Sequence, residues 1–293
     1  MTIRVFYHHP DDKQFSFDFV NPDLEAIGER ILNYESHKSV KVEQYELDQT
    51  VYVVYTSSGA TGDADTIEYD LVDQISAMAP ANSVIATRYV GLFKEVLKGN
   101  YEEEGNRVQA YKDVAAEDIE PALNQVNWDG SATEIAGRLA SNLILKHALP
   151  NANHRTAIGM VQTYLRRIEP DFSMPDTARQ RNGDDEYAWM GWVNEYIEES
   201  KRLLTVRRKG DRFQYLSQFG CDILERKHGI EIMLDEYNLS LPASERWRQY
   251  AEQHEELWVE FVENAVRRSG YEELIDTKGL TKHEFAEQLE QMQ

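Results

Sequence analysis

Hydrophobic and polar positions alternate in the first part of the chain with the period of two that a β-strand produces. Two alternating runs occur, at residues 3–7 and 15–19, and residues 40–45 and 51–55 form a second predicted strand pair. After the second run, Asn21 and Pro22 form a pair typical of a helix start, with Asn as the cap and Pro in the first turn. The pattern predicts a small α+β unit over residues 1–62, which ends in a Ser/Gly-rich linker at residues 57–62.

From about residue 69 the apolar positions recur with the 3.6-residue period of an α-helix. Candidate helices lie at residues 82–98, 115–127, 132–147, 153–168, 184–204, 211–228, 243–268 and 282–292. We therefore expect a mainly α protein. Its parts would be the N-terminal α+β extension, a helical core over residues 70–205 and a C-terminal helical region over residues 206–293.

Composition narrows the functional classes. The chain has 52 acidic and 31 basic residues, a net charge of −21, which disfavours general binding to nucleic-acid phosphates. No run approaches the roughly 18 apolar residues of a membrane span, so we expect no membrane insertion. The N-terminus lacks the apolar run of a signal peptide, and Cys221 is the single cysteine, so we expect a reducing, cytoplasmic location. His8 and His9 should face opposite sides of a strand, which argues against a metal pair there.

The chemically informative stretch is residues 131–167, which predicts two buried helices joined by a tight loop at Pro150. The N-terminus of the second helix favours anions, because its first backbone N–H groups point out of the helix end. Arg155 lies in that first turn and offers a planar fork for phosphate oxygens. His147 lies at the other edge of the loop, where a general base is useful. This combination suits phosphoryl or nucleotidyl transfer.

Residues 147–155 read HALPNANHR and resemble the Fic/Doc (Fido) signature, His-x-Phe-x-Asp/Glu-Gly/Ala-Asn-Gly/Lys-Arg. The residues after it, TAI at 156–158 and YLRR at 164–167, resemble the Doc branch in particular. The resemblance implies a Fido-type helical bundle with the motif between two central helices. It also implies transfer of AMP or phosphate from ATP, or another nucleotide, to a hydroxyl of a target protein. In Doc-type proteins that target is a translation elongation factor.

The resemblance also implies residue roles. His147 corresponds to the base that deprotonates the target hydroxyl. The nucleotide phosphates would be held by Ala152, Asn153, His154 and Arg155. Asn151 stands at the position of the acidic Mg²⁺ ligand.

Three departures from the signature leave alternatives open. Asn151 replaces the acid, and an uncharged amide binds a hard cation more weakly. Leu149 replaces Phe, and His154 replaces Gly or Lys, which removes a charge or adds bulk. One alternative is therefore a catalytically silent Fido module that binds a protein partner or a nucleotide. Another is a toxin whose antitoxin is a separate chain. The simplest alternative for His147 is a histidine that interacts with a helix C-terminus, and for Asn151 and Asn153 it is ordinary turn and cap chemistry.

Overall fold

The chain forms two structural units in the computed structural model, which describes residues 3–35, 38–57, 62–64, 71–104, 107–179 and 189–291. Unit 1 comprises Met1–Gly59 with Glu198–Ala251, and unit 2 comprises Ala60–Ile197 with Glu252–Gln293. The region 206–293 is therefore divided between the two units. Residues 58–61 of the expected linker lie outside the described residues.

Unit 1 contains the strands that the sequence pattern predicts. The antiparallel sheet has the order β2-β4-β3, with bounds β2 Ser16–Asn21, β3 Ser39–Glu46 and β4 Thr50–Ser57. Helix α1 (Leu24–Leu32) follows β2, but Asp23 caps it instead of Asn21. The side chain of Asp23 accepts from the backbone N of Glu25, while Asn21 accepts from the backbone N of Asp23. The helix therefore begins two residues later than expected.

A second small sheet joins the two chain segments that make up unit 1. Strand β1 (Arg4–Phe6) pairs in parallel with β7 (Ile223–Glu225), and β7 pairs antiparallel with β8 (Glu231–Met233). Short 3₁₀ helices η2 (Lys227–Gly229) and η3 (Leu234–Glu236) flank β8. The expected helix at 211–228 is therefore wrong in its second half.

The expectation of a mainly α protein is also wrong. Helix accounts for 56% and strand for 15% of the structure, and the described strands form three small sheets, so the fold is mixed. Helix α7 (Gly191–Ser217) is one helix where we expected two, and Gly220, just after its end, has a φ of +83° that breaks the helical path. Strands β7 and β8 have three residues each, too few to produce an alternating pattern.

Gly210, in the expected gap between two helices, lies inside α7 for a packing reason. A Cβ there would meet the Arg246 side chain at 2.5 Å. Arg246 is buried and pairs with Asp211 at 2.7 Å. The glycine thus makes room for a buried arginine and does not mark a helix end.

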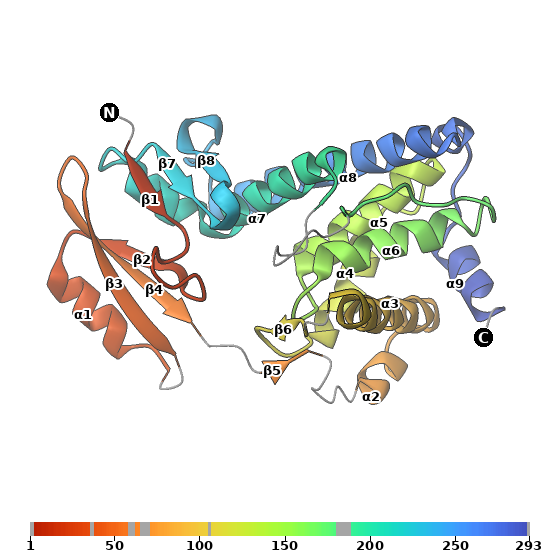
Figure 1. The fold of residues 1–293 in the computed structure, drawn as a ribbon, viewed down its shortest axis with the longest axis horizontal. Helices are drawn as coiled ribbons and strands as arrows, with labels where there is room; N and C mark the ends of the chain where they lie inside the picture. The colour runs from red at the N-terminus through yellow and green to blue at the C-terminus, as the bar shows by residue number, and fades with distance from the viewer. Residues whose placement is uncertain are drawn as a thin grey trace. The chain divides into compact units, whose positions relative to one another are not determined.

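Unit 2 is predominantly helical and holds the Fic/Doc-like motif (Figure 1). Its described elements are α2 Val72–Ser76, α3 Pro80–Glu104, η1 Ala116–Asp118, α4 Ile119–Gln125, α5 Ala132–Lys146, α6 Asn153–Leu165, η4 Glu272–Ile275, α9 Lys282–Glu290, the two-stranded ladder of β5 Gly62–Asp63 with β6 Gln109–Ala110, and the second half of α8 Ala243–Ser269. Helix α5 packs against α4 and α6, and α3 packs against α6 and α9. The predicted helices at 82–98, 132–147, 153–168, 243–268 and 282–292 are confirmed. The predicted starts at 132, 153, 243 and 282 agree to the residue, whereas α3 extends to Glu104, beyond its predicted end.

The packing of α5 explains its apolar sequence. Twelve of its 15 residues are buried. At Gly137 the helix approaches the backbone of α8 so closely that a Cβ would lie 2.5 Å from Cα of Val259. Across the described part of the chain, no helix has both the length and the apolar run needed to cross a membrane.

Candidate functional site

The site is the loop between α5 and α6, and it begins where α5 is forced to stop. A capping box starts the helix: the backbone N of Glu134 donates to Ser131 Oγ at 3.4 Å, and Glu134 Oε2 accepts from the backbone N of Ser131 at 2.8 Å. The helix ends at His147, which has φ +54° and ψ +43°. This left-handed conformation turns the chain sharply and puts the imidazole at the mouth of the loop.

Ala152 ends the loop with a second left-handed residue, at φ +53°. Each such conformation costs about 1–2 kcal/mol for a residue that carries a Cβ. Two within six residues therefore require bonds that hold the loop in place. The signature places a Gly or an Ala at position 152, and the left-handed backbone gives a reason for the Gly.

Asn153 supplies those bonds. Its buried side chain accepts from the backbone N of Leu149 at 3.2 Å and donates to the carbonyl O of Leu149 at 3.1 Å. The two bonds fix which side of the amide carries the NH₂ group. That NH₂ faces His147, with Nδ2 at 3.5 Å from the imidazole Nε2. Asn153 is the first residue of α6 and does not cap it; it closes the loop on itself.

A second segment, residues 109–115, runs beside the loop and bonds to it at several points. The backbone N of Ala115 donates to the carbonyl of Ala148 at 2.8 Å, and Lys112 Nζ donates to the carbonyl of His147. Asn151 Nδ2 donates to the carbonyl of Gln109 at 2.8 Å. The loop is thus held from both sides, by Asn153 within and by this segment outside.

Arg155 and His154 leave α6 on different sides, although they are neighbours in sequence. Arg155 Nη1 donates to Asn100 Oδ1 of α3 at 2.6 Å, and the side chain lines a cavity of about 440 Å³ between α3, α6 and residues 174–178. The His154 ring lies 6.0 Å from the buried ring of Trp258 on α8. The structure therefore brings His147, Asn151, Ala152 and Asn153 together at the loop, places Arg155 in the adjacent cavity, and directs His154 elsewhere.

The residues at the loop do not fit a Mg²⁺ site. Asn151 carries no charge, and its Oδ1 already accepts from the backbone N of Ala152 at 2.6 Å. Hard divalent cations prefer several carboxylate or carbonyl oxygens. Of the described residues, one group has ligand atoms close enough to surround an ion, and it is His9, Asp11 and Glu43 in unit 1.

That unit 1 group is already engaged by hydrogen bonds. His9 Nδ1 accepts from the backbone N of Asp11 at 3.2 Å, so Nε2 carries the ring proton, 2.7 Å from Glu43 Oε1. A metal at Nε2 would have to displace this proton and reverse the tautomer. The geometry is that of a buried His–carboxylate pair.

Two residues at the site, Lys112 and Asn100, were not identified from the sequence. Lys112 bonds the carbonyl of the residue that carries the candidate base, and Asn100 holds the Arg155 guanidinium. Asn100 lies 55 positions from Arg155. No local pattern marks either residue, because only the packing of α3 and of the 109–115 segment brings them to the loop.

No curated protein and no solved structure matches the chain. Over residues 1–293 it matches a protein family described as a family of unknown function, DUF8172, and it therefore belongs to that family.

Proposed function

We propose that this protein transfers a nucleotidyl or phosphoryl group from ATP, or a related nucleotide, to a hydroxyl of a target protein. The single observation that supports the proposal best is the orientation of Asn153. Its two bonds to the backbone of Leu149 turn its NH₂ toward His147 Nε2.

That orientation bears on the protonation of His147. An N–H on Nε2 would point at the N–H of the Asn153 amide, which is unfavourable, whereas a lone pair on Nε2 accepts from it. The arrangement therefore favours the tautomer in which Nδ1 carries the proton and Nε2 is basic. The contact of 3.5 Å is long, so it orients the ring and leaves Nε2 able to take a proton.

The proposed step uses these groups as follows. His147 Nε2 takes the proton of the target hydroxyl while the hydroxyl oxygen attacks a phosphorus of the nucleotide. The bond from that phosphorus to its bridging oxygen breaks, and ADP leaves if the γ-phosphorus is attacked, or pyrophosphate if the α-phosphorus is attacked. The N-terminus of α6 and the Arg155 guanidinium stabilise the phosphate charge. A guanidinium carries five N–H donors, so its bond to Asn100 is compatible with phosphate contacts.

Labelled ATP tests the proposal and separates its two forms. The full-length protein is incubated with a cell lysate and either α- or γ-labelled ATP. Label that appears on a protein band from the α-labelled nucleotide alone indicates AMP transfer. Label from the γ-labelled nucleotide alone indicates phosphate transfer.

His147→Ala and His283→Ala are the matched variants for this assay. Both remove one imidazole from unit 2, but His283 is exposed on α9, far from the loop in sequence. We expect label transfer to be lost in His147→Ala and retained in His283→Ala. Equal labelling by the two variants would refute the assignment of the base.

A second function, a silent module that binds a nucleotide or partner without transfer, is favoured by the bonds of Asn151. Both ends of its amide are occupied, by the backbone N of Ala152 and the carbonyl of Gln109. At the position of the metal ligand, the side chain thus serves the loop. ATP binding by the wild type without label transfer to any lysate protein would establish this second function.

A further inference from the structure

The antiparallel sheet of unit 1 ends on one side in a long strand with an open edge. Strand β3 (Ser39–Glu46) pairs with β4 on one side only, because the order of the sheet is β2-β4-β3. Outside the ladder with β4, no backbone group of residues 39–46 bonds to another described residue. Every second residue of an edge strand points its N–H and C=O away from the sheet. Strand β3 therefore presents a row of backbone donors and acceptors to a further strand.

The opposite edge of the same sheet is interrupted, whereas β3 is regular. In β2 (Ser16–Asn21) the register against β4 shifts between Phe17 and Phe19, and a bulge of this kind hinders pairing at an edge. Strand β3 pairs with β4 over all eight residues without a shift, and it contains no proline. A regular edge of this length is suited to the addition of a strand.

The order of charges along β3 identifies which strand fits this edge. Lys38 precedes the strand and Glu46 ends it, and both lie four positions from Val42. Lys41 and Glu43 are the two neighbours of Val42. The positive charges thus lie on one side of Val42 and the negative charges at the same distances on the other. A second strand of the same sequence, running in the opposite direction, places a glutamate opposite each lysine.

We propose that two copies of this chain associate through β3, with the two strands antiparallel about a two-fold axis at Val42. Val42, which is 40% exposed, then lies opposite Val42 of the other copy. Lys41 lies opposite Glu43 of the other copy, and Lys38 opposite Glu46. By symmetry each pair of charges occurs twice. The two three-stranded sheets become one sheet of six strands.

The neighbouring registers do not fit. In an antiparallel pair, two opposite residues either both bond across the pair or both point away, so the axis passes through a residue and not between two residues. An axis at Lys41 or at Glu43 would place like charges directly opposite each other, which is unfavourable. An axis at Val40 or at Gln44 would bring no lysine opposite a glutamate within residues 38–46. The charges therefore select the axis at Val42.

The contacts that these side chains already make are compatible with the pairing. Lys41 Nζ lies 3.0 Å from Asp12 Oδ2, and Glu43 Oε1 lies 2.7 Å from His9 Nε2. An ammonium group has three donors and a carboxylate has two oxygens, so each group can hold a partner in its own copy and one in the other. The interface lies in unit 1, and it does not depend on the motif at residues 147–155 or on the proposed transfer.

The oligomeric state of the full-length protein tests this proposal. Analytical ultracentrifugation over a range of concentrations gives the dissociation constant of the dimer. The measurement is made at about 0.15 M salt, because the long-range repulsion between two chains of net charge −21 is then largely screened. We expect the wild type to dimerise, and Val42→Lys to raise the dissociation constant about tenfold or more, because two ammonium groups would lie opposite each other. Val72→Lys is the matched control, since it changes an exposed valine of α2 in unit 2, and it should leave the constant unchanged.

An exchange of charges tests the register. Lys38→Glu and Glu46→Lys should each raise the dissociation constant about threefold or more, because each variant turns opposite-charge pairs into like-charge pairs. The double variant restores opposite charges and should dimerise as the wild type does. This rescue requires that position 38 of one copy lies opposite position 46 of the other. A double variant no tighter than the single variants would overturn the proposal.

Val42→Cys tests the position of the axis. Opposite Cα atoms in an antiparallel pair lie about 4.5–5.5 Å apart, within reach of a disulfide. Oxidised glutathione should therefore convert this variant to a covalent dimer, which non-reducing electrophoresis detects. The native Cys221 is buried, and Val72→Cys, at a position that is 73% exposed, should cross-link far more slowly. Equal cross-linking of the two cysteine variants would overturn the proposal, as would a wild type that stays monomeric at every concentration.

Discussion

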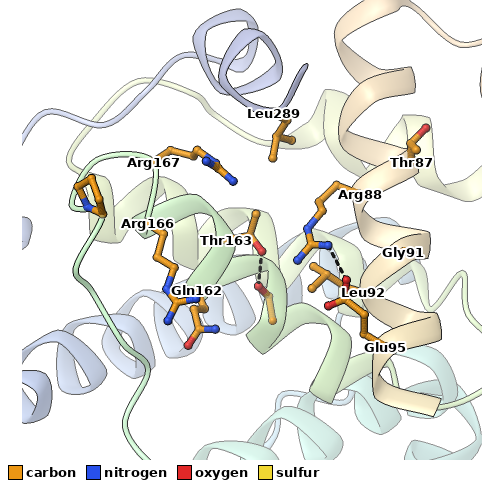
Figure 2. Close-up of a pocket in the computed structure, with 12 residues that line it drawn as sticks. Thr87, Arg88, Gly91, Leu92, Glu95, Gln162, Thr163, Arg166, Arg167 and Leu289 are labelled. Atoms are coloured by element: carbon orange, nitrogen blue, oxygen red, sulfur yellow. Dashed lines mark hydrogen bonds and ion pairs between the residues drawn. The ribbon is translucent and has the colours of Figure 1, made fainter. Parts of the chain in front are cut away.

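The two ends of helix α6 carry polar groups that are used in opposite ways. At the N-terminal end, Asn153 and Asn151 direct their amides at the backbone of their own loop and of residue 109. At the C-terminal end, Arg166 and Arg167 line a cavity of about 730 Å³. Side chains at the first end mainly hold the backbone of the loop in place, and those at the second end line an open space (Figure 2). A polar motif can therefore be largely structural, while its functional groups are the few that remain directed outward.

At the N-terminal end those few groups are His147 and Arg155. His147 is left at the loop mouth by a left-handed backbone, and Arg155 extends into the cavity beside α3. The other members of the motif hold these two in position. Substitutions should therefore separate into those that change chemistry and those that change stability.

The largest effect is expected for His147→Ala on transfer activity. A general base contributes roughly 10²–10⁴ in rate, and the wild-type imidazole is only partly buried, so its loss should leave the fold intact. The rate of label transfer and the thermal unfolding midpoint are measured together. A variant that loses activity and stability in parallel would instead make His147 a structural residue.

Asn153→Ala should have the next largest effect, and on stability. The variant leaves the buried backbone N and O of Leu149 without their partners, which costs about 1–3 kcal/mol. Chemical denaturation of the full-length protein gives the change in unfolding free energy.

Thr163→Ala is the matched change at the other end of α6. Thr163 Oγ1 donates to the carbonyl of Gly159, which is already a helix acceptor, so the loss should stay below about 1 kcal/mol. If Thr163→Ala destabilised the protein as much as Asn153→Ala, the contrast between the two ends of α6 would be wrong.

The same contrast explains what could be predicted from sequence. The loop between α5 and α6 is encoded within residues 131–165, so its helices, its turn at Pro150 and the place of His147 at its edge were all predictable from local pattern. The cavity at the C-terminal end of α6 is assembled from residues on α3, α6 and α9, which are far apart in the chain. No local period brings Arg88 and Arg167 to the same cavity, so this cavity could not be predicted.

The errors in the prediction of the fold have a related cause. Strands β2, β3 and β4 have six to eight residues, long enough to produce a strand pattern, and they were predicted. Strand β7 has three residues and depends on β1, more than 200 positions away, for its pairing. The helical period that continues to Ser217 led to the wrong prediction of a helix as far as residue 228. The helix stops because of the backbone conformation of Gly220 and not because the hydrophobic pattern changes.

Arg155→Ala should weaken ATP binding by about tenfold, and Arg155→Lys by less. Alanine removes both the charge and the planar fork, whereas lysine keeps the charge but cannot bond bidentately. Calorimetric titration with ATP compares the three proteins. Equal affinity of the wild type and Arg155→Ala would place the phosphates outside the cavity next to Asn100.

The smallest effect is expected for Asn151→Asp, and its direction should depend on whether Mg²⁺ is present. The new carboxylate would stand beside the bound triphosphate, so it stabilises the complex only when a cation lies between them. ATP affinity should therefore rise a few-fold with Mg²⁺ and fall a few-fold when the metal is removed by chelation. The wild-type amide is engaged by the backbone N of Ala152 and the carbonyl of Gln109, and a carboxylate can keep the first bond but not the second. A loss of affinity that is equal with and without Mg²⁺ would mean that position 151 serves the loop alone, and the N-terminal end of α6 would then bind phosphate through its backbone and Arg155 without a metal.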